Sequence, residues 1–287
     1  MIRTLIISGG STKTIAVLGA VQYLEEQNKL SSVINYVGTS AGSMLCFFLS
    51  LGYSIQEILE ILKTEFLGKN LHALDMDELL NLNIINSYGM DSGNQIVSFM
   101  QQVMFSRLKR QEATFLEYAK ITGKNLVVCV ANITKNTSEH LSVDTHPNLN
   151  VIDALRMSIG IPFLFTPIKY NDCFYVDGGI YESFPLSYVN QYTDPLQDTI
   201  AINTVLKQDN KSIDTFLDFV GRIIHTIVEK ANDTSITSSK LQIVNIEFEK
   251  GNLASFAFDK MKFDIDMEEM YENIQKGYNI MKLHFEK

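Results

Sequence analysis

Residues 36–42 of this chain read Tyr36-Val37-Gly38-Thr39-Ser40-Ala41-Gly42, a β-like run that ends in Gly-x-Ser-x-Gly. A compact helical pattern, residues 43–51, follows at once. Strand, tight turn and helix in this order are what a nucleophile elbow needs, because the serine at the turn is held in a strained conformation with its hydroxyl exposed. Gly38 and Gly42 leave room for strand and helix to pass close by. Ser40 is therefore a candidate nucleophile.

The same stretch places Ser40 next to a helix N-terminus. Free backbone N–H groups and the helix dipole favour a developing negative charge at such a position. The alternative interpretation is a tight structural turn with an incidental serine, because the bare pattern also occurs by chance. The motif alone does not distinguish the two.

Composition and charge exclude several classes of protein. With 287 residues, 46% of them hydrophobic, the chain can bury one large core. A net charge of −9 argues against a nucleic-acid surface and against a polybasic membrane anchor, so any membrane contact would have to be hydrophobic. The apolar run at residues 44–49 is too short to span a bilayer, and the run at residues 5–7 ends too early for a signal peptide. We expect a cytoplasmic protein that touches membranes only peripherally.

The beginning of the chain predicts a parallel sheet. Residues 4–7 form a strand pattern, residues 8–14 a Gly-rich loop, and residues 14–27 a helix pattern in which Gly19 permits close packing on a sheet. The next strand leads into the elbow, so a parallel α/β sheet with right-handed crossovers is expected. The loop lacks the glycine spacing of a dinucleotide site and the Gly-Lys-Ser/Thr ending of a P-loop. Its place beside the elbow favours an oxyanion hole.

The rest of the chain is expected to continue the same α/β domain, residues 1–287, without a linker or a repeat. Its motif-bearing core would span about residues 4–190, and C-terminal strands and helices about residues 199–287. Hydrophobic periodicity predicts helices at residues 54–66, 75–82, 92–110, 150–159, 215–230 and 266–284, a loop at 82–90, and strands at 125–133, 139–143, 173–176, 199–205 and 241–248.

A second chemical signal is Asp177-Gly178-Gly179, at the end of a predicted strand. Open α/β sheets place their sites at the carboxyl ends of strands, and Gly178 and Gly179 let other backbone approach. Alone this signal is weak, because Asp-Gly is also a common turn. A serine hydroxyl needs a base to accept its proton, and a carboxylate pointing at Ser40 could be that base. Partial burial would have to raise the pKa of Asp177 for it to work near neutral pH.

The chain shows no spacing typical of a metal site or a disulfide. Its cysteines are odd in number and are expected to be reduced and buried: Cys46, Cys129 and Cys173. Several acidic side chains could suggest calcium, but they lack the loop spacing of a calcium site and are interpreted as a solvated face: Asp75, Asp77, Asp264, Asp266 and Glu268.

Ordered motifs resemble the patatin-like phospholipase family over about residues 5–185. The family shows a Gly-rich oxyanion loop with a basic residue, then Gly-x-Ser-x-Gly, then Asp-Gly-Gly/Ala. In this chain these look like residues 9–13, 38–42 and 177–179. Two further segments are similar to the family: residues 154–165, and residues 114–118 leading into 124–126. Several matches in the right order are more specific than any one of them.

The resemblance implies a three-layer α/β fold, with a central, mostly parallel sheet flanked by helices, and a Ser-Asp dyad without histidine. Ser40 would attack an ester carbonyl, and Asp177 would take and return the proton while an acyl-enzyme forms and is hydrolysed. No metal or organic cofactor is implied. Main-chain N–H groups would hold the oxyanion, each worth about 2.7–4 kcal/mol in the transition state: those of Gly9, Gly10, Ser11 and Ala41.

The oxyanion loop departs from the family pattern. Ser8 stands where an acidic residue is usual, and Ser11 and Thr14 stand in place of glycines. If Ser11 adopts positive φ, it carries a strain that glycine would not. Lys13 keeps the charge of the usual basic residue without its planar fork, so that it would steady the loop or meet a lipid phosphate less specifically. These changes bear on rate and substrate more than on fold.

Two rival hypotheses remain. A conventional α/β-hydrolase would use Ser40, Asp177 and either His225 or His284, but the elbow follows only the second predicted strand, and both histidines lie in helix patterns typical of packed or solvated residues. The other rival is a catalytically silent lipid-binding or scaffolding protein whose oxyanion loop has drifted. Retention of both Ser40 and Asp177 argues against it.

The resemblance also implies partners. The expected substrate is a phospholipid or another acyl-ester lipid, met transiently at a membrane or micelle surface, and no nucleic acid is expected. The lipid class, the acyl position and the oligomeric state do not follow from the sequence.

Overall fold

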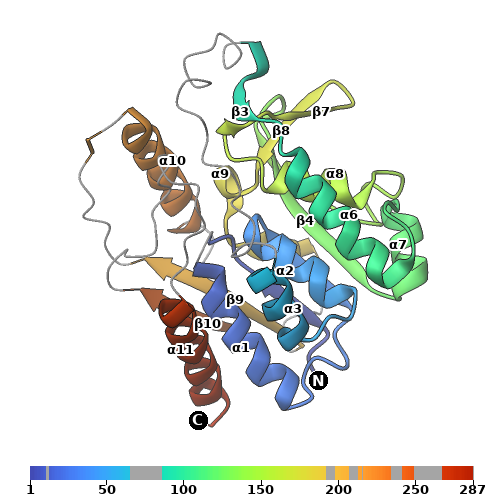
Figure 1. The fold of residues 1–287 in the computed structure, drawn as a ribbon, viewed down its shortest axis with the longest axis vertical. Coiled ribbons are helices and arrows are strands. Elements are labelled where there is room, and N and C mark those ends of the chain that lie inside the picture. Colours follow the sequence, from blue (N-terminus) through green and yellow to red (C-terminus); the bar gives the residue numbers. More distant parts are fainter. Residues whose placement is uncertain are drawn as a thin grey trace.

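A mixed sheet of eight strands forms the centre of the computed structural model (Figure 1). The structure describes residues 1–10, 13–64, 86–191, 198–206, 213–214, 216–233, 241–248 and 267–286. The strands lie in the order β10-β9-β1-β2-β4-β8-β7, with β5 also paired to β4. Their bounds are β1 Thr4–Ile7, β2 Asn35–Thr39, β4 Asn125–Asn132, β5 Thr137–Leu141, β7 Ile168–Tyr170, β8 Cys173–Asp177, β9 Thr199–Leu206 and β10 Gln242–Phe248.

The sheet is parallel from β10 through β9, β1 and β2 to β4. Beyond β4 the direction changes, because β5 and β8 both run antiparallel to it, and β7 runs antiparallel to β8. A separate short pair joins β3, Gly89–Asp91, to β6, Phe163–Phe165. The predicted parallel opening and the predicted neighbouring pair near residues 125–143 are confirmed.

Helices flank the sheet, as predicted, and Figure 1 shows α1, α2 and α6 in front of it. The two faces of β1 illustrate the layers, since side chains alternate along a strand. Leu5 and Ile7 belong to the large helix-covered core, whereas Ile6 packs on the other face with Phe184 and Val189. The helices are α1 Thr14–Glu26, α2 Ala41–Ser50, α3 Ile55–Leu62, α6 Asn94–Leu108, α7 Phe115–Thr122, α8 Val151–Ser158, α9 Gly179–Glu182, α10 Phe216–Asp233 and α11 Met267–Phe285, with a 3₁₀ turn at Leu186–Gln191.

Gly19 permits a close contact, but its partner differs from the one predicted. A Cβ at Gly19 would lie 1.7 Å from the carbonyl oxygen of Ile274, and one at Gly277 would lie 1.7 Å from that of Ala16. The two glycines therefore bring the backbones of α1 and α11 together. Gly19 serves a contact between helices from opposite ends of the chain rather than a contact with the sheet.

The predicted helices and strands agree with the structure to different degrees. The predicted helices in the described part of the chain are present with shifted ends, whereas α7 and the short elements β3, β6, β7 and α9 were not predicted. The helix expected at residues 75–82 lies outside the described residues. Within those that are described, no helix combines the length and apolar character needed to cross a membrane.

Candidate active site

Ser40 occupies the turn between β2 and α2 with φ 53° and ψ −127°, a conformation that a non-glycine residue adopts only under strain. The flanking glycines make this turn possible. A Cβ at Gly38 would lie 2.5 Å from the backbone nitrogen of Ser43, and one at Gly42 would lie 2.4 Å from the carbonyl oxygen of Ser8. The turn has the geometry expected of a nucleophile elbow.

The hydroxyl of Ser40 donates a hydrogen bond of 2.6 Å to Oδ2 of Asp177. The other carboxylate oxygen, Oδ1, accepts the backbone N–H of Gly179 at 2.8 Å. Gly178 lets the chain turn against β4, since a Cβ there would lie 2.4 Å from the carbonyl oxygen of Cys129. The structure thus brings the two predicted residues together and fixes the carboxylate on both sides.

Strand pairing along β4 explains why Ser40 and Asp177 meet. On one edge of β4, β2 pairs in parallel as far as Thr39 opposite Cys129. At the next residue of β4, Val130, β8 pairs in the antiparallel sense with its last residue, Asp177. Because β5 pairs with the other edge of β4 from Val128 to Asn132, β2 and β8 run toward each other on the same edge. Their carboxyl ends therefore converge where Ser40 and Asp177 lie.

Burial changes the proton affinity of Asp177, which is only 7% exposed. Loss of hydration disfavours the charged carboxylate and raises its pKa from 3.8 to about 6, against the opposing hydrogen bonds from Ser40 and Gly179. A carboxylate in this range is ionised at neutral pH and still basic enough to accept a proton.

The Gly-rich loop lies against Ser40, as predicted, because a Cβ at Gly9 would be 3.5 Å from Cβ of Ser40. One expected oxyanion donor needs correction. The N–H of Gly9 donates to the carbonyl oxygen of Ser183 at 2.7 Å, so it is not available to an oxyanion in this conformation. Ser11 lies outside the described residues. Ala41 begins α2, where the first N–H groups have no intrahelical acceptor.

Thr204 of β9 holds the Gly-rich loop in place. It bonds Ser8, which stands at the position where the family pattern has an acidic residue. The hydroxyl of Ser8 accepts the N–H of Thr204 at 3.1 Å, and the hydroxyl of Thr204 donates to the carbonyl oxygen of Gly9 at 3.2 Å. A Cβ at Gly10 would lie 2.4 Å from that same hydroxyl oxygen. Lys13 closes the loop by donating its N–H to the carbonyl oxygen of Gly10 at 3.0 Å.

Ser158, at the end of α8, is a site residue that sequence reasoning matched to the family without giving it a role. Its buried hydroxyl accepts the N–H of Ser40 at 2.8 Å and donates to the carbonyl oxygen of Cys129 at 2.6 Å. It therefore links the strained turn to β4. In the sequence, only the similarity of the segment before Pro162 to the family drew attention to Ser158. Its hydrogen-bond partners are distant in sequence, so no local pattern predicted its role.

Comparison with known proteins places this chain in a family. The model for patatin-like phospholipases matches residues 5–189. This chain belongs to the patatin-like phospholipase family. A relative named "Probable lipid hydrolase 463L" from Invertebrate iridescent virus 6 is 32% identical over 87% of this chain and 86% of its own length. The uncharacterized protein R571 of Acanthamoeba polyphaga mimivirus is 24% identical over 98% of this chain and 93% of its own.

Solved structures support the patatin-like fold. VipD from Legionella pneumophila superposes with a TM-score of 0.60 at 16% identity, over 99% of this chain and 66% of VipD. The type III effector ExoU gives a TM-score of 0.51 at 15% identity, over 99% of this chain and 53% of ExoU. The present chain thus spans about two thirds and about half of these two proteins, and the likeness concerns the fold alone.

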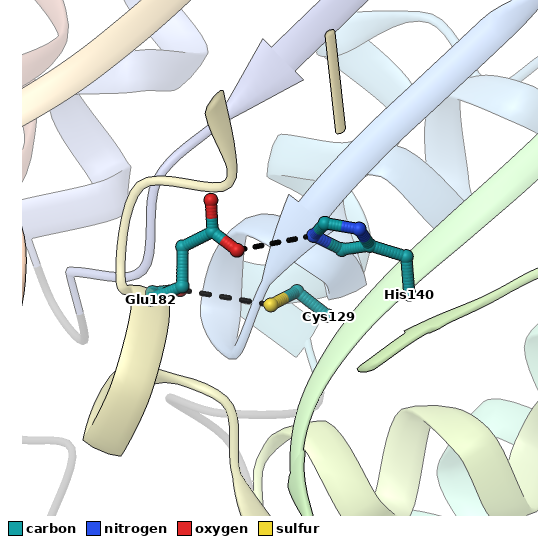
Figure 2. Close-up of side chains that lie close together, drawn as sticks. All are labelled: Cys129, His140 and Glu182. Atoms are coloured by element: carbon teal, nitrogen blue, oxygen red, sulfur yellow. Dashed lines mark hydrogen bonds and ion pairs between the residues drawn. The ribbon is translucent and has the colours of Figure 1, made fainter. Parts of the chain in front are cut away.

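The patatin-like core also contains a buried cluster beside the dyad, formed by Cys129, His140 and Glu182 (Figure 2). Nε2 of His140 lies 3.1 Å from Oε2 of Glu182, and the thiol of Cys129 donates to the carbonyl oxygen of Glu182 at 3.7 Å. The Glu182 carboxylate also accepts the N–H and the hydroxyl of Ser187, each at 2.7 Å.

These contacts make the cluster an anchor for α9. The carboxylate of Glu182 is already satisfied by His140 and Ser187, and burial raises the pKa of the Cys129 thiol well above its usual value. The hydroxyl of Thr39, the residue before Ser40, donates to the carbonyl oxygen of Glu182 at 3.0 Å. Glu182 thereby ties the helix after Asp177 to the strand that ends at Ser40. The sequence carried no local signal for this cluster.

None of the histidines in the described part of the chain contacts the dyad. The side-chain partners of Ser40 and Asp177 are each other and the N–H of Gly179. His225 pairs with Glu229 one turn along α10, at 3.5 Å. His284 packs edge-on against the ring of Phe285 at the end of α11.

Proposed function

We propose that this chain is a lipid acyl hydrolase that cleaves carboxylic esters with a Ser40–Asp177 dyad. The observation that carries the proposal is the 2.6 Å hydrogen bond from the Ser40 hydroxyl to the buried carboxylate of Asp177. Family membership and the relative named a lipid hydrolase support an acyl-ester lipid as the substrate.

In the proposed reaction, Oγ of Ser40 attacks the ester carbonyl carbon while its proton passes to Oδ2 of Asp177. The tetrahedral intermediate collapses, the C–O bond to the alcohol breaks, and the alcohol leaves with the proton from Asp177. Water then attacks the acyl-Ser40 ester, giving its proton to Asp177, and the acid departs as Ser40 recovers its proton. Asp177 thus alternates between base and acid, without a net change.

We assign the oxyanion contacts to the N–H of Ala41, at the start of α2, and to the N–H of Gly10 in the Gly-rich loop. The dipole of α2 adds to this stabilisation. Because the N–H of Gly9 is used by Ser183, the loop supplies fewer donors in this conformation than the family pattern implies.

The engaged Gly9 N–H favours one competing function, a lipid-binding protein without turnover. The free energy of folding that the dyad costs argues against this function. Burying Asp177 beside a strained serine destabilises the fold, and packing alone would not need either residue.

Labelling with a fluorophosphonate probe tests the proposal. We expect a single covalent adduct on Ser40 in the wild type, no adduct in Ser40→Ala, and labelling at least about a hundredfold slower in Asp177→Asn, because the base is removed. The double variant His225→Gln/His284→Gln should label at the wild-type rate. A folded wild type that forms no adduct would support the lipid-binding protein without turnover. Loss of labelling in the histidine variant would support a Ser-Asp-His triad.

A further inference from the structure

The helix α10 packs with its inner face against α9, the short helix that follows Asp177. The side chain of Val228 approaches Gly179, where an added Cβ would lie 3.5 Å from its Cγ2, two residues beyond Asp177. Ile224 is buried against Leu164 and Phe165. One face of α10 therefore forms part of the surroundings of the candidate active site.

The opposite face of α10 exposes large apolar side chains. Phe219, Ile223 and Ile227 are 51%, 45% and 42% exposed, respectively. They follow one another at intervals of four residues, which places one apolar side chain on the same side of each helical turn. We call these three residues the α10 stripe. A contiguous exposed apolar surface of this kind marks an interaction site more often than scattered single residues do.

The charges around the α10 stripe fit a lipid surface. At 3.6 residues per turn, the stripe, Thr226 and Lys230 share an arc of about 100°, and this arc contains no acidic residue. The whole chain, by contrast, carries a net charge of −9. Thr226 and Lys230 are exposed. No carboxylate would have to leave water when the stripe meets lipid, and the Lys230 ammonium would lie at the level of the phosphates.

We propose that the α10 stripe is the surface by which this protein docks on the lipid aggregate that contains its substrate. The inference rests on the proposed function, because it takes the substrate to be a lipid. Insertion of the stripe among headgroups and upper acyl chains would hold the inner face of α10, and the dyad near it, one helix diameter, roughly 10 Å, from the lipid surface. Docking through the stripe would thus shorten the distance that a substrate travels between the lipid and Ser40.

The absence of tryptophan from the chain provides a direct reporter of docking. Phe219→Trp places one fluorophore on the stripe. Phe105→Trp is the matched control, because Phe105 is 49% exposed and lies on α6, away from α10 in Figure 1. Both variants are made in the Ser40→Ala background, so that hydrolysis does not alter the lipid.

With phosphatidylcholine vesicles, we expect the emission of Phe219→Trp to shift to the blue and its quenching by iodide to decrease, while Phe105→Trp stays unchanged. Equal responses of the two variants, or no response of Phe219→Trp, would overturn the proposal. An emission that is already blue-shifted without vesicles, in a protein that is dimeric by light scattering, would show that a second copy covers the stripe and would also overturn it.

Vesicle co-sedimentation gives a second test. Phe219→Gln/Ile223→Gln/Ile227→Gln should weaken partition onto phosphatidylcholine vesicles by at least about tenfold, because three apolar side chains no longer enter the lipid. The matched variant Phe105→Gln/Ile121→Gln/Leu283→Gln removes similarly exposed side chains from α6, α7 and α11 and should partition like the parent. Circular dichroism establishes that each variant is folded, and Ile223→Gln alone replaces the triple variant if it is not. Equal loss in the two sets would overturn the proposal.

These measurements separate the two proposals. Binding is recorded without catalysis, so a wild type that fails to react with fluorophosphonate but docks through the stripe contradicts only the proposed hydrolase. A wild type that labels at Ser40 but shows no stripe-dependent binding contradicts only the docking surface.

Discussion

The burial of Asp177 in the fold sets its proton affinity. Burial raises its pKa to about 6, whereas the unfolded chain would titrate near the ordinary value of 3.8. The folded state therefore holds this proton more tightly than the unfolded state. The contribution of Asp177 to stability is fully present below about pH 4 and is lost as pH rises through 6, by an amount on the order of 3 kcal/mol.

Two pH profiles check this assignment. With a water-soluble ester, kcat/KM should rise with pH and level off above an apparent pKa near 6, as Asp177 becomes ionised. Asp177→Asn should remove this limb together with most of the activity, and its stability, measured by urea unfolding, should exceed that of the wild type at pH 8. An unchanged limb in the residual activity of Asp177→Asn would assign the titration to another group.

Ser158 is a positioning residue that acts through the backbone of Ser40. In Ser158→Ala, the N–H of Ser40 and the carbonyl oxygen of Cys129 lose their partner. We expect a loss of about 1–3 kcal/mol in stability and a fall in kcat of about tenfold or more with little change in KM, because the strained turn is less well held.

A buried serine elsewhere separates positioning from stability. Ser50→Ala removes the hydroxyl that contacts Tyr118 at 2.7 Å and the carbonyl oxygen of Phe47 at 3.0 Å, away from the dyad. It should lower stability similarly and leave kcat unchanged. If both variants lower kcat in proportion to stability, Ser158 has only a structural role.

The sequence predicted those site residues whose adjacent residues form a recognisable motif. Ser40 and Asp177 are each accompanied by glycines required by close backbone contacts, and those glycines form readable local motifs. Ser158 and Glu182 act through partners more than 100 residues away, such as the N–H of Ser40 and the hydroxyl of Thr39. No local pattern records such a partner, so their roles required the structure. The engagement of the Gly9 N–H by Ser183 is of the same kind.

At the scale of elements, strong periodicity and caps decided what could be predicted. The strands of the parallel sheet and the long helices have clear patterns. The helix α7 was overlooked although Thr114 and Glu117 form a reciprocal capping box, a signal that was available. The pairs β3–β6 and β7–β8 involve strands of three residues, too short to show a period.

The contact between α1 and α11 yields a prediction about stability. Alanine normally stabilises a helix by about 1 kcal/mol relative to glycine. Gly19→Ala and Gly277→Ala should instead destabilise the protein by about 1–3 kcal/mol or more, because each methyl group meets the backbone of the opposite helix. Thermal unfolding checks the sign. A stabilised variant would show that the helices do not approach this closely in solution.

At the scale of the whole molecule, the order of motifs along the chain predicted part of the architecture. The expected α/β sheet with flanking helices is present, and so is the order of loop, elbow and aspartate. The sequence did not show that β8 would be antiparallel to β4 and would share an edge with β2. Strand direction depends on pairings between distant segments, and a hydrophobic pattern reads the same in both directions.

The head-on approach of β2 and β8 along β4 also has a consequence during protein synthesis. The nucleophile leaves the ribosome 137 residues ahead of its base. Until β8 pairs with β4, the nascent chain holds a serine that has nothing to receive its proton. A potentially membrane-damaging activity, in the proposed function, would thus be withheld from every nascent chain in which β8 has not yet been made and paired with β4.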